Sequence, residues 1–214
     1  MIGGQFDFLL KLSVFSPVLP LVLIPFKLIR APRLSLGALL VLLMWNFLTD
    51  LVSLYMAHHG SGNHQIYVGY CVGLSLALYW VYWLEISERS IKKTMTTVLM
   101  LFLAFTGVVA FKFNGLGEYR PEIYIVLSTL TLIGSMLYFV KIYRDLEILN
   151  LYRYYFYWLN SGIMVYFGST IILTFFEMSV LSQEIFYHKY LWPIQLISTI
   201  IFNLFVARAI WTVK

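Results

Sequence analysis

Long apolar stretches separated by short polar segments dominate the chain. A helix that crosses about 30 Å of hydrocarbon needs roughly 20 mostly apolar residues, and seven stretches reach that length. The pattern therefore predicts an all-α integral membrane protein, a single seven-helix transmembrane domain over residues 1–214. The predicted spans are 8–29, 35–57, 65–86, 94–112, 122–143, 155–176 and 187–210.

The composition excludes a water-soluble globule. Of 214 residues, 61% are hydrophobic and 12% are charged, whereas soluble domains carry about 25% charged residues. The net charge of +5 does not indicate a nucleic-acid partner, because the basic residues lie between apolar stretches and do not gather on a polar face. The predicted partner is the lipid bilayer.

Basic residues predict the orientation of the seven spans. Lys and Arg accumulate on the cytoplasmic side of short loops, and the fifteen basic residues divide unevenly between the two sides. The pattern predicts an outside N-terminus, an inside C-terminus and a multi-pass protein of the bacterial inner membrane. Eleven lie on the predicted inner side (Lys27, Arg30, Arg33, Arg89, Lys92, Lys93, Lys141, Arg144, Arg153, Arg208 and Lys214) and four on the other (Lys11, Lys112, Arg120 and Lys189).

Prolines interrupt the first span. Pro17, Pro20 and Pro25 each lack a backbone N–H and crowd the carbonyl four residues back. We therefore expect this helix to be kinked or broken. Broken helices expose backbone groups to substrates in transporters, although membrane helices also tolerate proline without such a role.

A 3+1+3 internal repeat is a further possibility. Sliding the chain on itself by 114 residues brings together a basic turn and a buried amide, and duplicated halves are common in transporters. The superposed pairs are Lys27 with Lys141, Arg30 with Arg144 and Asn46 with Asn160.

Polar side chains inside the spans are the candidate ligand-binding residues. They come from spans two, six and seven, where amides, hydroxyls and one carboxylate recur at helical spacing. Such groups hydrogen-bond across helix contacts or line a ligand pocket, and both interpretations stay open. The predicted pocket residues are Asn46, Asp50, Asn160, Tyr166, Gln195 and Asn203.

Four histidines, His58, His59, His64 and His188, fall at the predicted outer rim. Imidazoles gathered with carboxylates can bind zinc, and the arrangement is similar to zinc-dependent seven-helix hydrolases of the ceramidase and adiponectin-receptor type. The chain departs from that group in having one histidine near span seven where a spaced pair is expected. The alternative is that these are solvated loop histidines.

Two other seven-helix groups provide comparisons. Microbial rhodopsins attach retinal to a lysine in the middle of the last helix, and the segment IQLISTIIFNLFVARAIW has none, so no retinal Schiff base is expected. The length and the triplet pattern resemble the SWEET and PQ-loop sugar transporters in architecture, but the Pro-Gln pair of that group is missing.

The segments FYWLNSGIMVYFGSTIIL and WPIQLISTIIFN resemble uncharacterised small seven-helix bacterial inner-membrane proteins that are often encoded beside sensor kinases. This resemblance implies a membrane sensor or accessory subunit, and it implies no catalytic residues.

Three functions follow as hypotheses. The first is a sensor or accessory subunit that binds a small ligand or lipid in an outward-opening polar pocket and signals to a membrane or cytoplasmic partner. The second is a small-solute carrier of the 3+1+3 design, and the third is a zinc-dependent membrane hydrolase at the outer rim. The first is preferred, with no cofactor and no enzymatic activity expected.

Overall fold

The computed structural model describes residues 2–30, 33–59, 64–112, 120–145, 151–179 and 191–213. The regular elements within these ranges are helices, and seven segments are long and apolar enough to cross a membrane. The predicted all-α fold with seven membrane-spanning segments is confirmed, and it is the architecture of a multi-pass membrane protein. Orientation, internal repeat and bacterial inner membrane stay predictions.

The chain divides into two compact units, Met1–Ala31 with Ser128–Lys214, and Pro32–Leu127. The first unit contains α1 (Ile2–Phe15), α2 (Val18–Arg30), most of α6 (Pro121–Asp145), the short 3-10 helix η1 (Leu151–Arg153), α7 (Tyr155–Ser179) and α9 (Trp192–Thr212). The second unit contains α3 (Leu34–His58), α4 (His64–Glu85), α5 (Arg89–Lys112) and the start of α6.

Most predicted boundaries lie within a few residues of the observed ones. Helix α1 begins six residues before the predicted start at 8, and α9 begins five residues after the predicted start at 187. Helix α5 begins five residues before the predicted start at 94. Its first turn carries Arg89, Lys92 and Lys93, so the apolar stretch is shorter than the helix. Hydropathy detects the part of a helix that lies in hydrocarbon, and polar turns at its rim escape that signal.

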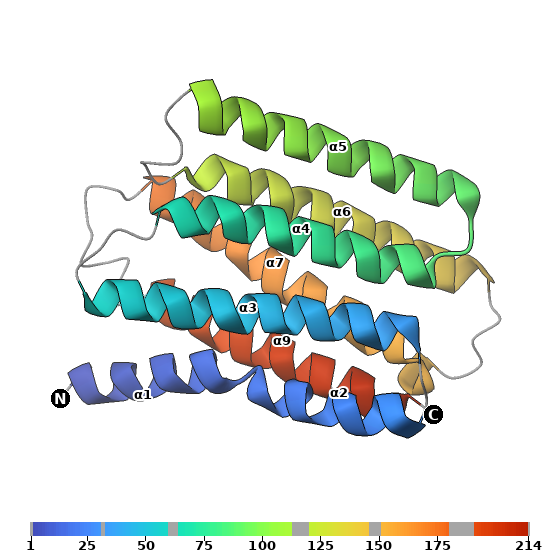
Figure 1. Cartoon of the computed structure of the whole chain (residues 1–214), viewed down its shortest axis with the longest axis horizontal. Coiled ribbons are helices and arrows are strands. Elements are labelled where there is room, and N and C mark those ends of the chain that lie inside the picture. Colours follow the sequence, from blue (N-terminus) through green and yellow to red (C-terminus); the bar gives the residue numbers. More distant parts are fainter. Residues whose placement is uncertain are drawn as a thin grey trace. The chain divides into compact units, whose positions relative to one another are not determined.

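The first span is broken at the position that its prolines predict. Helix α1 ends at Phe15 and α2 begins at Val18, and Figure 1 shows them as two separate helical segments. Pro17 has no N–H to donate to the Ser13 carbonyl. That carbonyl instead accepts hydrogen bonds from the Ser16 backbone N–H (3.2 Å) and the Ser16 hydroxyl (2.7 Å). The lost helical bond is thereby replaced locally.

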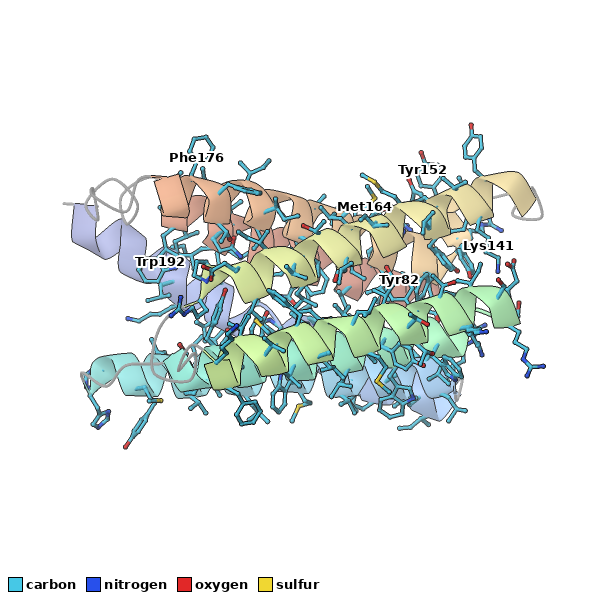
Figure 2. All side chains as sticks on the ribbon, turned by 90° about the horizontal axis from the view of Figure 1, so that it is seen from above. Tyr82, Lys141, Tyr152, Met164, Phe176 and Trp192 are labelled. Carbon is cyan, nitrogen blue, oxygen red and sulfur yellow. The ribbon has the colours of Figure 1, made fainter. Side chains whose placement is uncertain are left out.

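In the first unit, α9 packs against α7 on one side and against α1 and α2 on another. Phe176 and Trp192 lie at one end of this unit, and Lys141 and Tyr152 lie at the other (Figure 2), so α7 and α9 run antiparallel. The Lys27 ammonium group donates to the carbonyls of Trp211 (3.2 Å) and Val213 (2.7 Å). A cation is favourable there because the last carbonyls of a helix have no intrahelical donor.

The second unit is built by α4, which packs against α3 and α5. The Trp45 indole N–H donates to the Tyr70 carbonyl (3.3 Å), and the indole lies directly over Gly73. The Tyr79 hydroxyl pairs with the Thr96 hydroxyl at 2.9 Å. A small residue and two polar contacts therefore hold these helices together, as is common inside membranes.

Candidate functional site

A polar stripe runs along α9 within the first unit. Gln195, Thr199 and Asn203 follow one another at intervals of four residues, so they share one face of the helix. The Thr199 hydroxyl donates to the Gln195 carbonyl (3.0 Å), and the Asn203 amide donates to the Thr199 carbonyl (3.0 Å). At 1.5 Å per residue, the stripe covers roughly 12 Å.

One end of the stripe contacts α7. The Thr170 hydroxyl lies 2.8 Å from the Tyr166 carbonyl and 3.3 Å from Gln195 Oε1. The Thr170 hydroxyl has only one proton, and it donates this proton to the nearer acceptor, the Tyr166 carbonyl. Gln195 Nε2, at 3.1 Å, then donates to the Thr170 oxygen, and Gln195 Oε1 keeps its capacity to accept a hydrogen bond.

The other end of the stripe contacts the break in the first span. Asn203 Nδ2 donates to the Ser16 hydroxyl oxygen at 2.8 Å. Asn203 is 3% exposed, and it lies near the middle of α9, far from either rim of the span. The amide therefore bonds to the broken first span near the middle of α9.

The break also leaves a backbone acceptor without a helical donor. Pro20 has no N–H, so it cannot donate to the carbonyl of Ser16, four residues earlier. Ser16 thus presents a carbonyl and a hydroxyl beside Asn203. We call the group Ser16, Thr170, Gln195, Thr199 and Asn203 the polar seam.

Of the predicted pocket residues, the structure brings Gln195 and Asn203 into the polar seam and places Tyr166 beside it. The Tyr166 ring lies 5.5 Å from the ring of Phe202 on α9. The Tyr166 carbonyl accepts the hydrogen bond from Thr170 described above.

Asn160 has a different position. It is fully buried, and it pairs with Ser135 on α6: its Oδ1 accepts from the Ser135 hydroxyl (2.7 Å), and its Nδ2 donates to the Ser135 carbonyl (2.9 Å). It precedes Thr170 by ten residues, roughly 15 Å along α7. Its amide therefore joins α6 to α7.

Asn46 and Asp50 belong to the second unit, where they lie one turn apart on α3, both half-buried. Asn46 Oδ1 is buried and has no hydrogen-bond partner among the residues that the structure describes. Since this pair and the polar seam belong to different units, a single pocket that combines them stays a prediction.

The structure describes only two of the four histidine side chains proposed to bind zinc. His58 and His59 are exposed at the end of α3, and His59 Nδ1 lies 2.9 Å from the Tyr55 carbonyl. His188 and the side chain of His64 lie outside the described residues. Over the described part of the chain, no three His, Cys, Asp or Glu side chains gather as a metal site. Zinc therefore stays a prediction.

The chain matches no known protein family, no curated protein and no solved structure. The resemblance to small bacterial seven-helix proteins therefore stays a prediction as well.

Sequence reasoning missed two residues that pair with the predicted ones, Ser16 and Ser135. A signal for Ser16 was present, because a serine directly before a proline favours the start of a turn. Ser135 is one hydroxyl in a long apolar helix, and nothing in the sequence distinguishes it from Ser128 or Thr131.

Proposed function

We propose that this protein is a membrane sensor or accessory subunit that binds a small hydrogen-bonding ligand or lipid at the polar seam of its first unit. The observation that carries the proposal is the broken first span, where Ser16 contacts Asn203 near the middle of α9. Discontinuous helices with exposed backbone groups form ligand sites in other membrane proteins.

In this proposal the seam forms a path from the outside to the middle of the membrane. Gln195 lies near the start of α9, which the basic residues predict to be the outer end, and Asn203 lies at mid-span. Gln195 Oε1 and the Ser16 carbonyl can each accept a hydrogen bond from a ligand. The hydroxyl oxygens of Ser16 and Thr199 can accept further hydrogen bonds. A ligand with donor groups fits this set better than an anion does.

Helix α2 is suited to transmit occupancy to the other end of the membrane. It starts at the break, and it ends where Lys27 binds the last carbonyls of α9. A ligand that separates Ser16 from Asn203 would tilt α2 against α9 and strain this contact. Because the predicted inner loops are short, the output would pass to a partner protein.

Water access to the seam provides the first test. In a Cys71→Ala background, Ser16→Cys should react with a membrane-impermeant sulfonated maleimide added to intact cells, because the seam opens outward. Ala209→Cys, on the fully buried side of α9, is the matched control and should stay unmodified.

His58→Cys, at an exposed position at the end of α3, should react and shows that the reagent reaches the outer surface. Reaction of His58→Cys without reaction of Ser16→Cys, in cells or in purified protein, would contradict an outward-opening seam. Labelling of Ser16→Cys only in inside-out vesicles would place the opening on the opposite side.

Ligand binding and transport are then separated in proteoliposomes. A solute that binds the seam should raise the melting temperature of the purified protein, since binding to the folded state alone stabilises it. Asn203→Leu should abolish this shift. A sensor shows the shift without net uptake of the radiolabelled solute, whereas the carrier alternative, which the same broken helix also favours, requires net uptake.

A further inference from the structure

A basic groove lies in the second unit where α4 turns into α5. It has a volume of about 890 Å³ and is lined by Trp83, Ser87, Arg89, Ser90, Lys92 and Lys93. The lining contains three cations, two hydroxyls and no carboxylate, and the nearby Glu85 and Glu88 are not part of it. The volume is in the range of small-ligand sites.

The first turn of α5 sets the geometry of the groove. Lys92 N donates to the Glu88 carbonyl at 3.1 Å, so the helical bonding begins there. The backbone N–H groups at the start of this helix have no acceptor within it. Lys92 and Lys93 follow Arg89 by three and four residues, so all three lie on one face of α5.

Aromatic contacts fix the opposite wall. The Lys92 ammonium lies 4.6 Å from the centroid of the Trp83 ring, a cation–π distance. The Trp83 ring lies 5.5 Å from that of Tyr79, whose hydroxyl pairs with Thr96 on α5. Two contacts therefore join α4 to α5 beside the groove.

These features together suit a phosphate group. Cations with several N–H donors, hydroxyls and a helix N-terminus are the groups that bind phosphate oxygens in proteins. The groove also lies between the ends of two spans, Ile66–Glu85 and Arg89–Lys112, which is the depth of lipid headgroups. We propose that it binds the phosphate of an anionic phospholipid headgroup.

The surface of α4 favours a lipid over a soluble phosphate compound. Trp80 and Leu76 precede Trp83 by three and seven residues, so they continue its helix face into the span. Both are 45% exposed. An acyl chain can follow this apolar track from a headgroup held in the groove. This site is independent of the polar seam, which belongs to the other unit.

Lipid selectivity in nanodiscs or by native mass spectrometry tests the proposal. The wild-type chain should bind phosphatidylglycerol more strongly than phosphatidylcholine. The triple variant Arg89→Gln, Lys92→Gln, Lys93→Gln should lose most of that preference, at roughly fivefold in affinity for each basic residue removed. The charge-matched control is Arg30→Gln, Arg153→Gln, Arg208→Gln, three exposed arginines of the first unit, and it should keep the preference.

Three results would overturn the proposal. Equal loss in both triple variants would indicate general attraction to an anionic surface, and no loss in the groove variant would exclude the groove. Displacement of phosphatidylglycerol by inorganic phosphate at matching concentration would indicate a soluble phosphate compound. Trp83→Leu keeps all three basic residues but removes the aromatic wall of the groove and its cation–π contact with Lys92. It should therefore weaken phosphatidylglycerol binding even if the triple variant fails to fold.

Discussion

Gly162→Ala is expected to destabilise the protein by about 1–3 kcal/mol, the usual cost of adding a group to a well-packed contact. A Cβ atom at Gly162 would lie 2.8 Å from Phe205 Cβ, 3.4 Å from Phe202 Cδ2 and 3.5 Å from the Phe202 carbonyl oxygen on α9. Phe205 Cβ is fixed to the backbone, so no side-chain rotation relieves the collision. Helices α7 and α9 would have to separate.

The matched control is Gly168→Ala on the same helix. A Cβ atom there meets nothing within 4 Å, and alanine is the better helix former by up to about 1 kcal/mol. The two variants carry the same chemical change, so they should shift the free energy of unfolding in opposite directions. Denaturant titration in mixed micelles, followed by circular dichroism, measures both. Equal shifts would show that α7 and α9 do not approach closely at Gly162.

The seven spans could be predicted from the sequence because hydrocarbon enforces them. A chain in the bilayer must satisfy its backbone polar groups within each segment, so length and hydropathy alone locate the helices. The same reasoning predicted the break in the first span, since Pro17 and Pro20 remove two donors within one turn of helix. Each of these predictions concerns only where a residue lies along the membrane normal.

Rotation about each helix axis and the choice of neighbour could not be predicted in this way. Lipid tails are as apolar as leucine, so helix association in membranes depends on small residues and a few hydrogen bonds. Asn203 was predicted as a ligand-binding residue. Its hydrogen-bond partner Ser16 is 187 residues away in the sequence, so the pairing could not be predicted. Arg89, Lys92 and Lys93 served to predict orientation, and only the turn between α4 and α5 gathers them into a groove.

The polar seam and the basic groove differ in the kind of polar group that they contain. Neutral amides and hydroxyls occupy the middle of the first unit, where an unpaired charge would cost roughly 2.5–3.5 kcal/mol. Cations occupy the rim of the second unit, where they reach water and headgroups. The two proposed sites therefore suit different ligands, and the variants designed for one leave the residues of the other unchanged.

The pair formed by Asn160 and Ser135 is expected to contribute about 1–2 kcal/mol of coupling energy, at the upper end for hydrogen bonds between membrane helices. Both residues are fully buried, and two hydrogen bonds of 2.7 and 2.9 Å join them. Asn160→Ala removes both bonds. A double-mutant cycle with Ser135→Ala isolates the pair from the separate costs of each truncation.

Ser161→Ala is the control for this cycle, because the Ser161 hydroxyl donates to the Tyr157 carbonyl of its own helix. It should change the free energy of unfolding by less than about 0.5 kcal/mol. A coupling energy near zero would contradict a structural role for the amide. The same variants also test the predicted ligand role of Asn160. If Asn160→Ala unfolds more easily but keeps the ligand-induced rise in melting temperature, the amide joins α6 to α7. If that rise disappears as it does in Asn203→Leu, Asn160 belongs to the ligand site that the sequence predicts.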